Sequence, residues 1–192
     1  AASDVYKRQA LAYGIVGGTP QYLLQIDDRL SIEDNIKNTY LNPISFLYEE
    51  PTNLLKQEVR EPAIYTAIIT AIAVGASRMS DISNKVGEDS NICANYLKSL
   101  INLGIVKKET PYGEKTSRKS IYSIEDNMFR FWYRFVPNNN SVIMRGAADI
   151  VYRRIEPQLS EYMGAVFEEI CKQYLWKLLP VSYTHLTLPT KA

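Results

Sequence analysis

The chain has 192 residues, of which 46% are hydrophobic, and its formal net charge is +1. This length allows one sizeable core or two small ones, and the nearly neutral charge argues against a protein that coats polyanions. The two cysteines lack metal-ligand spacing, and the sequence shows neither a signal peptide nor an apolar run long enough to cross a membrane, so we expect a cytoplasmic protein.

The two ends of the sequence look foreign to the rest. Residues 1–9 (AASDVYKRQ) and 181–192 (VSYTHLTLPTKA) have the character of translated sequencing-adapter tails, so we expect them to lie outside the fold and the parent protein to be truncated on both sides. The only histidine, His185, falls in the second tail. Without it, histidine-based catalysis and zinc binding have no candidate residue.

Short helices are predicted over residues 10–60. The sequence Gly17-Gly18-Thr19-Pro20 is typical of a tight turn before a helix that starts with proline. It is not a phosphate-binding loop, because no Gly-Lys-Ser/Thr occurs anywhere in the chain. Amphipathic helices should follow from Ser31, through a capping box, and again across residues 45–59.

The segment from Pro62 to Ile124 has the order of a winged helix-turn-helix, with three short helices and a β-hairpin. We expect Ser80 to cap the second helix and Gly87 to end it. The third helix should bury Ile92, Tyr96, Leu97 and Leu100. The predicted helices and strands cover residues 62–73, 81–86, 90–104, 105–110 and 120–124.

The polar side chains of this unit are candidates for a contact with duplex DNA. Those on the third helix would reach base edges or phosphates, and those in the wing would contact the backbone. Residues 75–124 hold eight basic and five acidic residues, an excess of three positive charges, which gives only modest non-specific affinity. The candidates are Asn91, Asn95, Lys98, Lys107, Lys108, Lys115, Arg118 and Lys119.

An alternative is that the unit docks another protein or another domain of the same protein and never contacts nucleic acid. The acidic Glu88 and Asp89 beside the third helix favour this interpretation, because they would repel phosphate groups.

Aromatic residues dominate the stretch from Phe129 to Phe135 (FRFWYRF). Such a run can stack on bases, but more often it packs a domain junction while its arginines reach solvent. Pro137 to Asn140 marks a predicted domain boundary. Helices should follow across residues 147–154, from Pro157, and from Gly164.

Several long phrases resemble the archaeal-type P-loop ATPases of the AAA+/STAND group. They are YGIVGGTPQYL, LYEEPTNLLKQEVREPAIY, LINLGIVKKETPYG, YSIEDNMFRFWYRFV and YMGAVFEEICKQYL. The resemblance implies a mainly α fold with a small β-hairpin, arranged as a helical lid (10–60), a winged helix-turn-helix (61–136) and the helical start of a truncated PD-(D/E)XK-like domain (137–180).

The same resemblance implies roles for individual residues. Gly17, Gly18 and Pro20 would form the Gly-x-Pro motif of the lid, with the proline near the adenine of ATP. ATP and magnesium would bind to an N-terminal ATPase domain outside this sequence, so the fragment alone should neither need a cofactor nor hydrolyse ATP. Glu168 matches the first-helix acid of the nuclease-like domain, where one carboxylate alone is a poor metal site.

Overall fold

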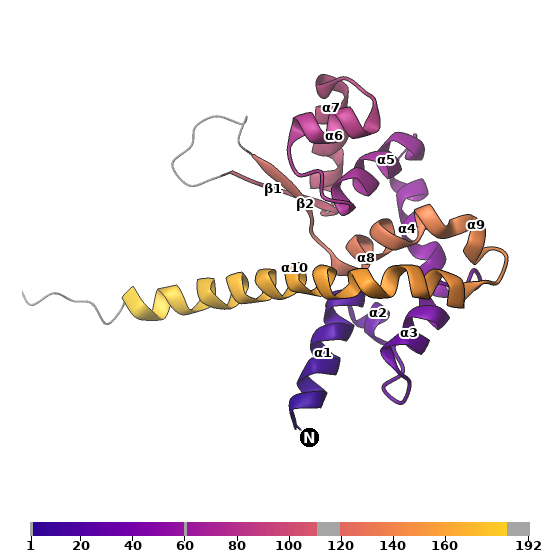
Figure 1. Ribbon diagram of the computed structural model, residues 1–192. Coiled ribbons are helices and arrows are strands. Elements are labelled where there is room, and N and C mark those ends of the chain that lie inside the picture. The colour runs from indigo at the N-terminus through magenta and orange to yellow at the C-terminus, as the bar shows by residue number, and fades with distance from the viewer. Residues whose placement is uncertain (1, 60, 111–119, 184–192) are drawn as a thin grey trace, which may run out of the picture.

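The computed structural model describes residues 2–59, 61–110 and 120–183, and within these ranges the fold is mainly helical with one antiparallel hairpin, as predicted (Figure 1). No helix in these ranges combines the length and the apolar character needed to span a bilayer. The elements are α1 (Ala2–Val16), α2 (Pro20–Leu23), α3 (Ile32–Thr39), α4 (Phe46–Glu58), α5 (Pro62–Ala73), α6 (Met79–Val86), α7 (Ser90–Asn102), β1 (Val106–Glu109), β2 (Ile121–Ile124), α8 (Asn127–Phe135), the 3-10 helix η2 (Pro137–Asn139), α9 (Asn140–Ile143) and α10 (Ala148–Tyr183).

Three helices and a hairpin follow one another in the predicted winged-helix order, from α5 to β2. The strands pair with Val106 opposite Ile124, and β2 is also joined to the α5–α6 connection, where the Tyr122 amide donates to the Ser77 carbonyl at 2.8 Å. Gly87 ends α6 in the left-handed region, with φ of +81°. Local signals were therefore sufficient to predict the order of these helices and strands.

Two details of the unit differ from the prediction. Ser80 does not cap α6, because the helix begins at Met79, two residues before the predicted start at Asp81, and the flanking Arg78 makes no side-chain cap. In α7 the buried face is turned by about one residue, so that Cys93 is fully buried while Ile92 is 38% exposed. The helix buries this face because spacings of four and three residues place Cys93, Leu97 and Leu100 on one side of it.

The aromatic helix α8 forms the centre of the molecule. The ring of Phe131 lies 4.7 Å from that of Tyr40 after α3 and 5.5 Å from that of Tyr162 in α10, and Trp132 Nε1 donates to the Tyr48 carbonyl in α4 at 2.8 Å. These rings are buried. The packing interpretation of the aromatic run is confirmed, because buried rings cannot stack on bases.

Helices α1 and α10 cross close to each other beside α8. The Tyr162 hydroxyl donates to the Gly14 carbonyl at 2.6 Å and also lies 3.3 Å from the Asn127 carbonyl. A Cβ on Gly14 would lie 2.6 Å from Met163 Sδ, so the absence of a side chain allows this approach. Helix α1 begins at Ala2, so residues 2–9 of the N-terminal tail form its first turns.

Helix α10 is one continuous helix, where separate helices were expected. Pro157 lies within it but is exposed. The carbonyl that loses its intrahelical donor can therefore bind water. Buried Val151 and Ile155 hold the helix on one side of Pro157, and buried Tyr162 and Val166 hold it on the other. The C-terminal part of α10 extends away from the other elements (Figure 1).

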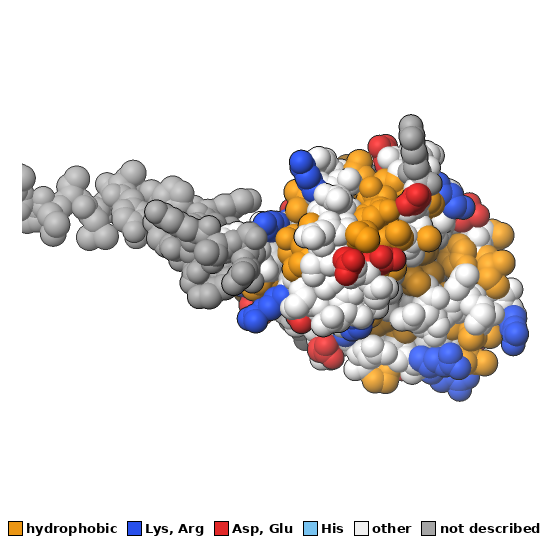
Figure 2. Space-filling model, turned by 90° about the horizontal axis from the view of Figure 1, so that it is seen from above, with side chains coloured by type: hydrophobic (Ala, Val, Ile, Leu, Met, Phe, Trp, Pro, Cys, Tyr) orange, Lys and Arg blue, Asp and Glu red, His pale blue; other side chains and the backbone are white. Residues whose placement is uncertain are grey.

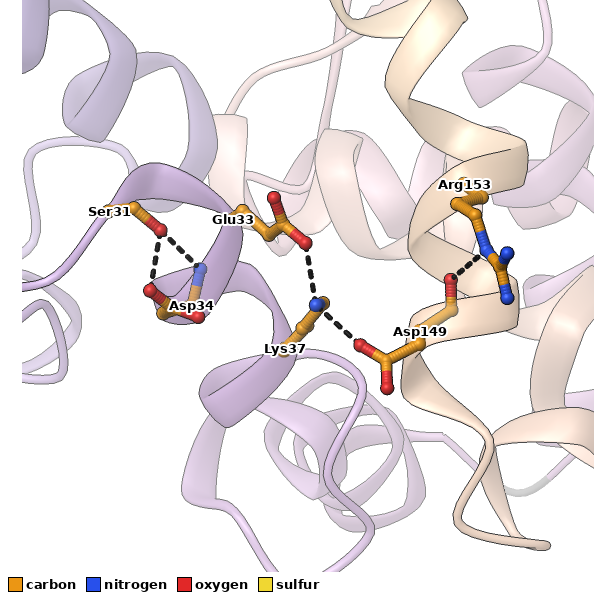
Figure 3. Close-up of polar contacts among 6 residues, drawn as sticks. All are labelled: Ser31, Glu33, Asp34, Lys37, Asp149 and Arg153. Atoms are coloured by element: carbon orange, nitrogen blue, oxygen red, sulfur yellow. Dashed lines mark hydrogen bonds and ion pairs between the residues drawn. The ribbon is translucent and has the colours of Figure 1, made fainter.

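A charged cluster fastens the start of α10 to α3 (Figure 3). Lys37 Nζ lies 2.6 Å from Glu33 Oε1 and 2.5 Å from Asp149 Oδ1, and it also approaches the Tyr152 ring, with 5.5 Å to the centroid. The predicted cap of α3 is present as well, since the Ser31 hydroxyl oxygen accepts from the Asp34 amide at 3.0 Å. The predicted lid segment and α10 are thus in direct contact.

Candidate nucleotide-facing turn and winged-helix surface

The Gly17–Pro20 turn lies between α1 and α2, against the start of α8. Gly17 is buried with φ of +72°, and its amide donates to the Tyr13 carbonyl at 2.9 Å. Gly18 and Pro20 are exposed. An exposed proline at a turn offers a flat apolar surface, which is what contact with a nucleotide base requires.

Asp126 connects this turn to α8. Its Oδ1 accepts from the amides of Met128 at 2.7 Å and Phe129 at 3.4 Å, so it is the N-cap of the aromatic helix. Burial raises the pKa of Asp126, although these amides and Arg130 act in the opposite direction. Sequence reasoning missed this residue, yet an Asp directly before a strongly patterned helix is a recognisable N-cap signal.

A cavity of about 420 Å³ opens beside the turn, and its charged lining is acidic. Asp126 and Glu58 both contribute to it, together with Thr19 and Tyr22. Burial and the nearby Glu50 raise the pKa of Tyr22 to about 12, so this phenol stays neutral. Because the charged side chains of the described lining are acidic, the phosphate groups of a nucleotide would need cationic partners from elsewhere.

The three polar candidates on α7 are all on the surface. Asn91, Asn95 and Lys98 are exposed, as base-reading side chains would have to be. Asn95 also lines a groove that contains Glu58 and Glu61. Seen from the winged-helix side, Lys and Arg side chains lie scattered, with acidic and hydrophobic side chains between them (Figure 2).

The two described lysines of the wing have different surroundings. Lys107 Nζ lies 2.7 Å from Glu169 Oε1 in α10 and 3.1 Å from Glu109 Oε1 in its own strand. Lys108 is exposed, and its Nζ lies 5.9 Å from the centroid of the Tyr122 ring. The other wing candidates, Lys115, Arg118 and Lys119, lie outside the described residues. One described lysine is therefore neutralised within the chain, and one is accessible.

The carboxylate that holds Lys107 could not be found from the sequence. Glu169 is 62 residues away in the chain, and no local pattern marks the pair. Partial burial lowers the pKa of Lys107, but its hydrogen bonds to Glu169 and Glu109 outweigh this effect and leave the pKa above its ordinary value. The hydrogen bond with Lys107 correspondingly lowers the pKa of Glu169.

We expect Glu169→Gln to lower the free energy of unfolding by about 0.5–1 kcal/mol at pH 7. A carboxyl group whose pKa is lowered by folding stabilises the protein above its unfolded pKa of about 4.3, and this stabilisation is lost as the pH falls through the lower folded value. The difference between wild type and variant should therefore vanish near pH 3 in urea unfolding. Glu156→Gln, at an exposed glutamate of α10 that forms no ion pair within the described residues, is the matched control, and an equal effect of both variants at pH 7 would contradict the assignment.

Glu168 itself has an ordinary surface environment. Its side chain is 68% exposed and pairs with Lys172 in the next turn of α10, with 2.8 Å between Oε1 and Nζ. In the described part of the chain, no group of three or more His, Cys, Asp or Glu side chains is placed to hold a metal ion.

Comparison with known proteins yields one relative and one family. The chain is 34% identical over 167 residues to the uncharacterized protein MJECL04 of Methanocaldococcus jannaschii. The match covers 86% of this chain but only 37% of the relative, so the chain spans little more than a third of that protein. No solved structure matches the chain. Residues 132–188, which include the end of α8, α9 and α10, match the family DUF234, described as archaeal and bacterial proteins of unknown function.

Proposed function

We propose that the chain is the regulatory docking part of a longer P-loop ATPase, in which the winged helix packs against other parts of the same protein. The observation that carries this proposal is the ion pair between Lys107 of the wing and Glu169 of α10. It commits a basic residue of the wing to an intramolecular contact, where a DNA-binding wing would present it to phosphates.

The surroundings of the pair support the same conclusion. The Lys107 and Glu169 side chains are only 23% and 27% exposed, respectively, so their contact is partly shielded from solvent. A shallow cavity next to the pair is shared between β2 and α10, and Tyr122, Ile124 and Tyr162 are among its lining residues. The wing is thus connected to the surface of α10 by a partly shielded ion pair at the edge of this cavity.

DNA binding is the second candidate function, because Asn91, Asn95, Lys98 and Lys108 are exposed on the same unit. Three or four phosphate or base contacts would give weak affinity that depends strongly on salt. The acidic Glu88 and Asp89 at the start of α7 would repel phosphate groups and so oppose DNA binding.

Fluorescence anisotropy with a labelled duplex distinguishes the two functions. We expect a dissociation constant weaker than about 10⁻⁴ M at physiological salt, the weak end of non-specific binding. Glu169→Gln, which frees Lys107, should improve it less than about threefold, because only one phosphate contact is gained. Binding tighter than about 10⁻⁶ M that weakens steeply with salt and is lost in Lys98→Glu would overturn the docking proposal in favour of DNA recognition.

The nucleotide role of the turn forms the second half of the proposal. In the longer protein, ATP and magnesium would be held by an ATPase domain, and the exposed Pro20 would contact the adenine while Gly17 and Gly18 shape the turn. The exposure of Pro20 and Gly18 supports this role, as does the position of Gly17, where an added Cβ would lie 3.0 Å from Asp126 Oδ2.

The test requires the longer protein that contains this segment. We expect Pro20→Ala to raise the KM for ATP about fivefold, because roughly 40 Å² of apolar contact contributes about 1 kcal/mol to binding. The kcat should change little, since a uniform binding contact is lost. Pro43→Ala, in the α3–α4 connection, is the control. An unchanged KM in Pro20→Ala would exclude adenine contact at the turn.

A further inference from the structure

We draw no further inference here: the strongest candidate, the exposed apolar stripe of Phe167, Cys171 and Tyr174 on the C-terminal part of α10, carries none because nothing in the structure shows what covers it.

Discussion

Replacing Phe131 by alanine is expected to lower the free energy of unfolding by about 3–5 kcal/mol, the range for truncating a buried aromatic side chain. Phe131 is fully buried, and its ring packs against three other rings: Tyr40, Phe135 and Tyr162. These belong to the predicted lid, to α8 itself and to α10. One truncation therefore leaves a cavity that borders the predicted lid, the central helix and the C-terminal helix.

The same variant tests whether these parts unfold together. The buried side chains form one continuous cluster from α1 to α10, so unfolding in urea should remain a single transition that moves to lower concentration with an unchanged slope. Tryptophan fluorescence and far-ultraviolet circular dichroism should report the same midpoint. Met144→Ala, at a side chain that is 61% exposed, should change stability by less than about 0.5 kcal/mol. Two separate transitions, of which only one moves, would contradict a shared core.

The shared core is where prediction from sequence reached its limit. The start of α5 and the ends of α6 and α7 were accessible because Pro62, Gly87 and Gly104 mark these helix ends through local backbone chemistry, whereas the start of α6 was not. The burial of α8 was accessible because so dense an aromatic run is most often packing. The particular partners of α8, such as Tyr40 and Tyr162, were not accessible, since they lie far away in the chain.

Two other differences have the same physical origin. A proline inside a helical pattern predicts a break, but Pro157 points to solvent and packing on both sides keeps α10 continuous. From the sequence alone, every lysine of the wing was also an equal candidate for a contact with the DNA backbone. Only the fold brings Glu169 to Lys107 and leaves Lys108 exposed, which gives the two neighbours different roles.

Substituting Gly17 is expected to have the second largest effect, a loss of about 2–3 kcal/mol in the free energy of unfolding for Gly17→Ala. The left-handed backbone at Gly17, with φ of +72°, costs a residue with a Cβ about 1–2 kcal/mol. The added Cβ would also lie 3.0 Å from Asp126 Oδ2. Relief of that contact requires the carboxylate to move, which weakens a helix cap of about 1 kcal/mol.

Two other glycines separate these contributions in urea unfolding experiments. Gly75 also has positive φ, +103°, but a Cβ there would meet nothing within 4 Å, so Gly75→Ala should cost only the backbone strain of about 1–2 kcal/mol. Gly18 has no positive φ, and its added Cβ would lie 3.6 Å from Tyr13, so Gly18→Ala should cost less than about 0.5 kcal/mol. If Gly17→Ala costs no more than Gly75→Ala, the turn does not press on Asp126, and the link from the turn to helix α8 fails. If it costs about 1 kcal/mol more, the exposed Pro20 is positioned by a turn that is fastened to the central helix of the fold.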